Sequence, residues 1–212
     1  ILVLILASIF TIVIHFVVFK SMKSQFIIDR DLNSVDNLPD AIPQYKYAQV
    51  KTMFPSFPNI AENSETIGLK EAKYLRKEKK YEEAIKILDS VHKFSPYIVY
   101  DYYLKCNIYK EQKKMDSAYV YGKKAFYAKP RNFYYYRMAS YLASTTKDTT
   151  EIVKMFNVYN TYRKEQQSYS YYAQCLGWSD YDVNKLKNIV DEGLKLYPKD
   201  PELLNLKSYL GK

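Results

Sequence analysis

Few side chains in this sequence of 212 residues are of the types that perform catalysis. Beyond the first twenty residues the only histidine is His92 and the only cysteines are Cys106 and Cys175, none at the spacing of metal ligands. No nucleophile or carboxylate motif accompanies His92, and five scattered glycines exclude the loops that cradle phosphates. We therefore expect no catalysis, metal or cofactor within these residues. His92 should be a surface or hydrogen-bonded histidine, and both cysteines should be reduced and buried.

Cations and tyrosines that recur at helical spacing between residues 73 and 141 could instead bind a partner. They fall on the first helix of each helical hairpin proposed below, on the side that lines a concave face. Lys and Arg side chains between tyrosine walls suit an acidic or extended peptide, because charge-assisted hydrogen bonds and aromatic contacts are both available. The alternative is that the tyrosines pack between helices and the cations are solvated. The candidate partner-binding residues are Lys73, Arg76, Lys77, Tyr103, Asn107, Lys110, Arg137 and Tyr141.

The net charge of +9 permits contact with acidic lipid, acidic peptide or nucleic acid, and by itself selects none of them. The densest basic run is Arg76–Lys80, which also suits the negative end of a helix. Glu82 and Glu83 follow at once, and no nucleic-acid-binding motif is present. We therefore expect a protein or peptide partner and no nucleic acid.

The elements that position these residues repeat at a step of 34. Tyr81–Pro96 returns as Met115–Pro130, with alanine and proline held at matching positions. Such a step is typical of helical hairpins stacked in a solenoid. In the second helix of the first hairpin, Ala84, Leu88 and Val91 form one apolar stripe. Helices are predicted over 65–79, 81–94, 97–112 and 116–128 for the first two hairpins.

The third and fourth hairpins are degenerate. The third starts near Asn132 and has Lys164 where proline is expected, although its apolar stripe is retained. The fourth is predicted over 169–180 and 182–196 and ends at Pro198, again in step. A last helix from Pro201 would cover the open end of the stack, since a terminal repeat has no neighbour to bury its face.

The first nineteen residues, ILVLILASIFTIVIHFVVF, are long and apolar enough to span a bilayer as a helix. Lys20 and Lys23 follow, and under the positive-inside rule they favour a cytoplasmic position for the repeats. Because the sequence starts at Ile1 inside this run, we expect it to be the C-terminal part of something longer. Half of the eight prolines then lie in a linker with one short helix over 44–53.

The predicted fold class is therefore all-α, an N-terminal transmembrane helix followed by an α-solenoid of about four hairpins. The segments are residues 1–19 (transmembrane helix), 20–63 (juxtamembrane linker with a short helix), 64–200 (repeats) and 201–212 (capping helix). Residues 64–130 resemble tetratricopeptide repeats in AKYLRKEKKYEEAIKILDSVHKFSP and NIYKEQKKMDSAYVYGKKAFYAKP. That resemblance implies a tetratricopeptide-type solenoid that binds peptides or scaffolds assemblies.

A narrower resemblance comes from the order of the pieces. An apolar span, a short helical linker, YEEAIKIL and then KPRNFYYYRMASYL are similar to the C-terminal end of membrane glycan ligases of the O-antigen ligase/polymerase superfamily. The resemblance implies a bacterial inner-membrane protein whose catalytic Arg and His residues lie upstream of Ile1. The chain would then be the scaffold region of a polytopic glycan ligase or polymerase; the alternative is a single-span adaptor with no enzymatic activity.

Overall fold

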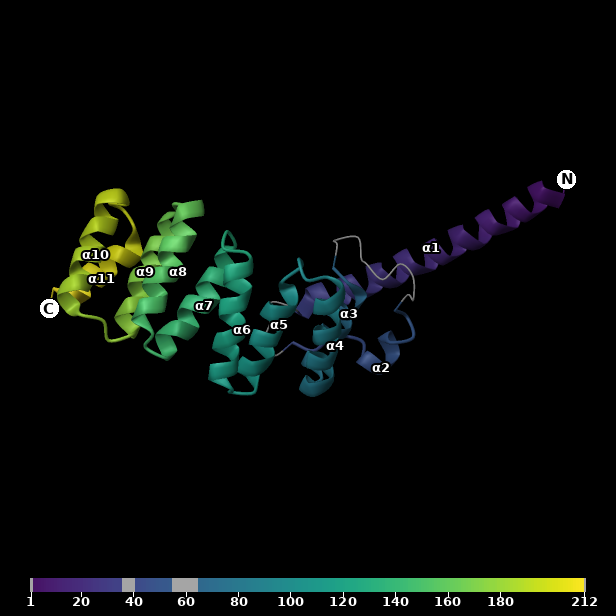
Figure 1. Cartoon of the computed structure of the whole chain (residues 1–212), viewed down its shortest axis with the longest axis horizontal. Coiled ribbons are helices and arrows are strands. Elements are labelled where there is room, and N and C mark those ends of the chain that lie inside the picture. Colours follow the sequence, from purple (N-terminus) through teal and green to yellow (C-terminus); the bar gives the residue numbers. More distant parts are fainter. Residues whose placement is uncertain (1, 36–40, 55–64, 212) are drawn as a thin grey trace. The chain divides into compact units, whose positions relative to one another are not determined.

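The structure, a computed structural model, describes residues 2–35, 41–54 and 65–211 (Figure 1). These residues form eleven α-helices and no strand, as the all-α class predicts. In chain order the helices are α1 (Leu2–Val35), α2 (Tyr47–Val50), α3 (Ile67–Lys77), α4 (Tyr81–Phe94), α5 (Tyr100–Glu111), α6 (Met115–Ala128), α7 (Phe133–Thr145), α8 (Thr149–Tyr162), α9 (Gln166–Trp178), α10 (Val183–Leu196) and α11 (Pro201–Leu210).

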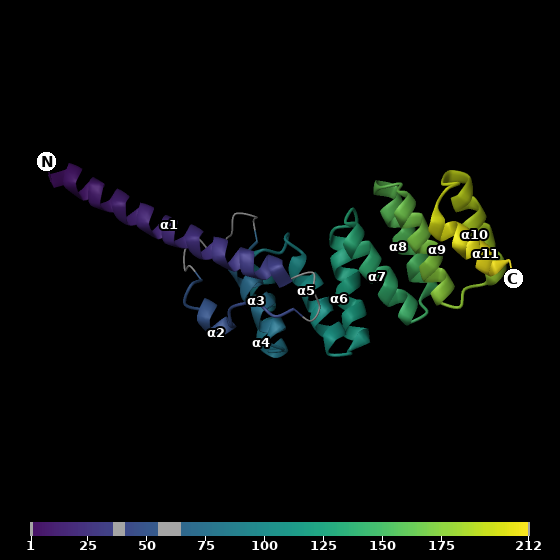
Figure 2. The same cartoon turned by 180° about the vertical axis from the view of Figure 1, so that it is seen from behind.

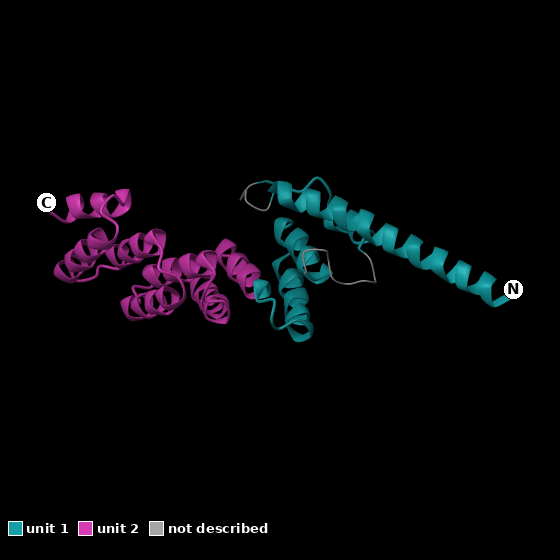
Figure 3. Ribbon diagram, turned by 90° about the horizontal axis from the view of Figure 1, so that it is seen from above, with its two compact units in different colours: residues 1–101 teal, residues 102–212 magenta. Residues whose placement is uncertain are grey.

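The chain divides into two compact units, Ile1–Asp101 and Tyr102–Lys212, which Figure 3 shows in different colours. In the first unit α3 packs against α4, α1 and α2. In the second, α7 contacts α6, α8 and α9, while α9 contacts α7, α8, α10 and α11. The odd-numbered helices α7, α9 and α11 therefore touch one another in series, as the first helices of stacked hairpins do.

The same backbone conformation recurs where the first helix of each hairpin ends, at steps of 34, 34 and 33 residues. One residue there has a left-handed conformation, with φ between 55° and 60°. The amide of the next residue donates to the carbonyl five positions back, at 2.8–3.3 Å, which closes the helix end as a Schellman motif. The left-handed residues are Lys79, Lys113, Lys147 and Asp180.

The second helix of each hairpin ends in the same way at every step. The residue after the helix, with φ between −146° and −131°, donates its amide to the carbonyl four residues earlier. These residues are Ser95, Lys129, Arg163 and Tyr197. Arg163 precedes Lys164 and not a proline; its ψ of 115° exceeds the 63° to 73° of the other three, but its amide makes the same hydrogen bond.

Burial follows the same register along the second helices. Ala84, Leu88 and Val91 are buried in α4, as predicted. The residues one, two and three repeat steps further on are buried as well. They are Ala118, Gly122 and Ala125 in α6, Ile152, Phe156 and Tyr159 in α8, and Leu186, Val190 and Gly193 in α10. Full burial of a side chain such as Leu88 contributes about 2 kcal/mol, so these stripes hold each hairpin together.

In the fourth hairpin the first helix, α9, is shifted by one residue relative to the repeat. Its connection, residues 179–182, is one longer than the corresponding connections 78–80, 112–114 and 146–148. Helix α9 therefore ends at Trp178, two residues before the predicted end, and begins at Gln166, three before the predicted start. Tyr197 nevertheless follows Arg163 by one full repeat step, because the shift is confined to α9.

Helix α1 is longer than the predicted span. It continues past Phe19 to Val35, so residues 20–35 are helical where a linker is predicted. Residues 2–20 are all exposed, whereas Ser21, Gln25, Ile28 and Leu32 are buried at intervals of three or four residues. Figures 1 and 2 both show this second half of α1 beside α3. The apolar stripe explains the extension, because it gives the helix a face to bury before the first proline, Pro39.

Candidate functional site

The first three candidate binding residues lie on α3, in the first unit. The Lys73 side chain is buried, with only 7% of the residue exposed. Its Nζ lies 3.4 Å from the Glu65 carboxylate and 4.9 Å from the centroid of the Tyr100 ring. Arg76 is half-buried on the same helix. Lys73 therefore stabilises its own unit.

Lys77 also serves a structural purpose. Its Nζ donates to the carbonyl oxygens of Val35, at 2.9 Å, and Ala41, at 3.2 Å. Val35 is the last residue of α1, where backbone carbonyls lack partners within the helix. A lysine from α3 thus caps the end of α1, and the negative end of the helix dipole favours the positive charge.

A buried carboxylate, which the sequence analysis missed, ties α1 to α3. Asp31 is 6% exposed. Its oxygens accept hydrogen bonds from the amides of Gln44, at 2.6 Å, and Tyr45, at 3.2 Å, and from the Tyr74 hydroxyl at 2.8 Å. Burial, reinforced by the bond to Asp31, holds the pKa of the Tyr74 hydroxyl well above its usual range. The signal in the sequence is an aspartate inside the apolar stripe of Ile28 and Leu32.

A second ion pair joins the same two helices. Lys70 of α3 is fully buried and pairs with Asp29 of α1. Around these polar contacts, Ile28, Leu32, Val50 and Tyr74 form an apolar cluster. Two of the three α3 residues that the sequence assigns to a partner are therefore engaged within the first unit: Lys77 by the end of α1 and Ala41, and Lys73 by Glu65 and Tyr100.

In the second unit the structure brings predicted residues together. The Lys110 Nζ lies 5.8 Å from the centroid of the Tyr141 ring. The Arg137 guanidinium lies 5.4 Å from the centroid of the Tyr171 ring. Such cation–π contacts hold a cation beside an aromatic surface without neutralising it. Of the other two candidates on α5, Tyr103 packs on the ring of Tyr135 with centroids 5.5 Å apart, and Asn107 is half-buried.

Two aromatic residues that the sequence analysis missed complete this group. Trp178 meets Tyr141 edge-on, with centroids 6.3 Å apart and an interplanar angle of 82°. It meets Tyr171 in the same way, at 6.0 Å and 83°. Trp178 is 53% exposed and Tyr141 is 39% exposed. We name Tyr141, Tyr171 and Trp178, with Lys110 and Arg137 beside them, the aromatic patch. Tyr171 lies 34 residues after Arg137, one position past the residue of α9 that matches Arg137 by helix start.

The charge around the aromatic patch is positive. Helices α7 and α9 contain no acidic residue, and Arg137 of α7 is exposed. Acidic residues of this unit lie on other elements: Glu111 follows Lys110 at the end of α5, Asp180 pairs with Lys147 just after α9, and others, such as Asp116 and Glu151, lie at the starts of the second helices. A carboxylate does approach the edge of the patch, because Gln174 of α9 donates to Glu202 of α11.

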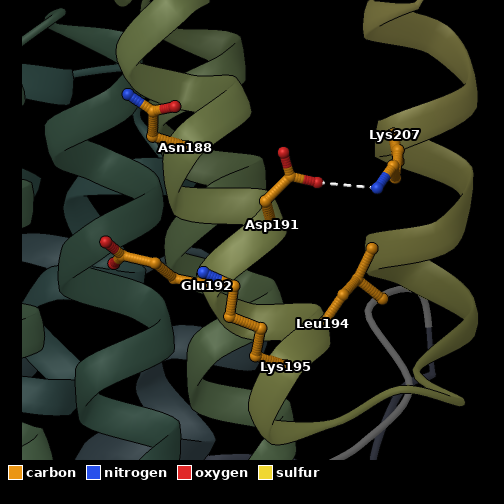
Figure 4. Close-up of a pocket in the computed structure, with 6 residues that line it drawn as sticks. All are labelled: Asn188, Asp191, Glu192, Leu194, Lys195 and Lys207. Atoms are coloured by element: carbon orange, nitrogen blue, oxygen red, sulfur yellow. Dashed lines mark hydrogen bonds and ion pairs between the residues drawn. The ribbon is translucent and has the colours of Figure 1, made fainter.

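One pocket between α10 and α11, lined mainly by α10, has a volume of about 550 Å³. Figure 4 shows Asp191 and Lys207 facing each other across it, and their side chains form an ion pair at 2.7 Å. Glu192 and Lys195 add one further negative and one further positive charge to the lining. Because the charges of the lining cancel, the pocket favours neither an anionic nor a cationic ligand, and the ion pair links the last two helices.

The three residues considered for catalysis, His92, Cys106 and Cys175, lie in surroundings that fit a structural role. The His92 Nδ1 lies 3.1 Å from a carboxylate oxygen of Asp101, which is buried. Cys106 and Cys175 are buried free thiols, as predicted. Burial raises the pKa of the Cys175 thiol to about 12, even though Tyr171 and Arg137 act in the opposite direction. Within the part of the chain that the structure describes, no group of three His, Cys, Asp or Glu residues could hold a metal ion.

Comparison with known proteins does not assign the chain to a family. No protein-family model matches the sequence. No curated protein matches it either. The conclusions about function therefore rest on the helical repeats, α1 and the aromatic patch.

Proposed function

We propose that this protein is a membrane-anchored helical-repeat scaffold that binds protein or peptide partners through the first helices of its hairpins. The observation that carries the proposal is the change of environment along α1. Every residue from 2 to 20 is exposed, most of them large and apolar, and burial begins at Ser21. Among the described helices, α1 is the one long and apolar enough to cross a membrane. A bilayer would cover this surface, which would otherwise be costly to expose to water.

The tetratricopeptide type is the best match for the repeats. The helix ends support it: the ends of the second helices recur at every step of 34 residues, which is the length of that repeat, and the left-handed residues recur at steps of 34, 34 and 33. Repeats of this kind mainly bind other proteins, which is consistent with an exposed aromatic patch on α7 and α9. Lys20 and Lys23 favour a cytoplasmic position for the repeats.

The parent protein is, in this proposal, a bacterial inner-membrane glycan ligase or polymerase of the O-antigen type, with its catalytic part upstream of Ile1. The order of an apolar span, a linker and repeats supports it. The second candidate is a single-span adaptor without enzymatic activity. The structural settings of His92 and the two cysteines fit both candidates, since the catalytic residues of the ligase would lie upstream. The reading frame upstream of Ile1 distinguishes the two: further apolar spans around a loop with Arg and His support the ligase, and a start codon within a few residues refutes it.

Anchoring is tested by fractionating cells that express the chain with a fluorescent reporter after Lys212. The intact chain should resist extraction by alkaline carbonate, and a variant lacking residues 2–19 should become soluble. The matched control removes no residue but replaces Ser8 and Thr11 by leucine, which keeps the span apolar and should leave the chain in the membrane. Release of the intact chain by carbonate would refute the anchored scaffold. Reporter fluorescence in sealed cells also reports on which side the repeats lie.

A further inference from the structure

We propose that the aromatic patch is a binding site for an acidic linear peptide with an aromatic or large apolar side chain between its carboxylates. The inference rests on the proposed scaffold function and names the ligand class and the residues. It also moves the site, because Lys77 of α3 caps the end of α1 and Lys73 is buried against Glu65.

The patch has the composition of an interaction hot spot. Trp178, Tyr141 and Arg137 belong to the three residue types that contribute most to binding at interfaces. The two edge-on contacts of Trp178 hold the rings in one arrangement, so little rotamer freedom remains to be lost when a ligand binds. Trp178 and Tyr141 nevertheless keep about half and two-fifths of their surface exposed. An apolar side chain of the ligand could bury that surface.

The charges favour an acidic ligand. Arg137 is exposed and its guanidinium lies against Tyr171, where it can donate in parallel to a carboxylate. Lys110 provides a second positive charge beside Tyr141. Since α7 and α9 contain no acidic residue, no negative charge of these helices opposes the ligand. The nearest carboxylate of α11 is that of Glu202, which accepts a hydrogen bond from Gln174 of α9 and so lies at the edge of the patch.

The dimensions favour an extended segment. The five residues come from α5, α7 and α9, three successive first helices. Packed helices lie roughly 8–10 Å apart, so the site spans about 20 Å. An extended chain covers about 3.3 Å per residue, and about six or seven residues would cross the site. Single-stranded nucleic acid also stacks on aromatic rings. Its binding, however, relies on a groove of positive charges that follows the nucleic-acid backbone, and this patch has two cations, Lys110 and Arg137, which is too few for such a groove.

Trp178 makes the test direct, because it is the single tryptophan of the sequence. The full chain in lipid nanodiscs would be titrated with the peptide acetyl-GEEDFDEEG-amide while tryptophan emission is recorded. We expect a saturable change in emission. Replacing the central phenylalanine of the peptide by alanine, or its acids by lysine, should weaken binding at least tenfold. Raising the salt concentration should also weaken it.

Variants of the chain locate the site. Arg137→Glu and Tyr141→Ala should each weaken binding at least tenfold, and Arg137→Gln should have a smaller effect because it removes the positive charge without adding a negative one. The matched control is Lys154→Glu, since Lys154 is also an exposed cation near a tyrosine ring, on helix α8. It should bind like the unmodified chain. Circular dichroism of each variant verifies that the helices are retained.

Three outcomes would overturn the inference: no saturable change in emission, equal losses for Lys154→Glu and Arg137→Glu, or tighter binding of an oligothymidylate than of the peptide. Failure of the scaffold function is separable from these results. A photo-crosslinker at Tyr97, 88% exposed in the first unit, and one at Tyr134, 72% exposed on α7, report which surface a partner meets. If a partner is captured only at Tyr97, the scaffold function is supported but the aromatic patch is not its binding site.

Discussion

Removal of the Asp31 carboxylate should release α1 from α3. Asp31→Ala deletes the acceptor of three hydrogen bonds, two from backbone amides and one from Tyr74. Tyr74 is 1% exposed, so its hydroxyl would be left buried without this acceptor. Loss of a buried charged group with several partners costs about 3–5 kcal/mol, allowing for the fact that such bonds are not additive. We expect the first unit to lose this much local stability.

Hydrogen exchange followed by mass spectrometry, on the full chain in nanodiscs, measures this loss. A tenfold change in an opening equilibrium corresponds to about 1.4 kcal/mol, so amides of residues 21–35 and of α3 should exchange about 10²–10⁴-fold faster. Asp31→Asn keeps one oxygen acceptor and should show a smaller increase. Exchange in α7 and α9, which belong to the other unit, should not change.

The matched control is Glu82→Ala, which removes an exposed carboxylate from the first turn of α4 in the same unit. Its interaction with the helix dipole contributes less than about 1 kcal/mol. If Asp31→Ala accelerates exchange no more than Glu82→Ala does, then the Asp31 hydrogen bonds do not hold α1 to α3, and the reasoning fails.

Three further predictions concern other residues. Lys113→Gly should raise the free energy of unfolding by up to about 1 kcal/mol, because glycine adopts the left-handed conformation without the Cβ penalty; Lys113→Ala keeps that penalty and should gain nothing in chemical denaturation. Burial raises the pKa of the Glu71 carboxyl, and the positive charge of Lys51 acts in the opposite direction. The folded chain therefore disfavours the charged carboxylate, and the folded state loses stability as the pH rises through that pKa. Glu71→Gln should therefore be more stable than the unmodified chain at pH 7, and the advantage should vanish below about pH 4, where the carboxyl is protonated in both states; a constant difference across this range would contradict the reasoning. Cys106 and Cys175 should react with iodoacetamide at pH 8 only after denaturation, as buried thiols; equal labelling of the native chain would show that the helices open.

The repeats could be predicted because their signals are local. The stripe of Ala84, Leu88 and Val91 recurs at every repeat step since each helix must bury one face, and each helix end is closed by hydrogen bonds to carbonyls four or five residues back. The third hairpin shows that the apolar stripe suffices, because Arg163 closes α8 with the same amide hydrogen bond although no proline follows it. The one-residue shift of α9 was not predictable, since a longer connection leaves the overall step unchanged.

The sequence by itself determined the helical hairpins, the apolar first half of α1 and the buried cysteines, since each depends on residues close together in the chain. Only the tertiary structure decided the use of the polar side chains. Asp31 and Tyr74 are 43 residues apart, and Lys77 and Val35 are 42 apart, so no periodicity relates them. That packing made Lys70 and Lys77 of α3 supports for α1. It also placed Trp178 between two tyrosines of α7 and α9, and so moved the candidate binding site to these helices.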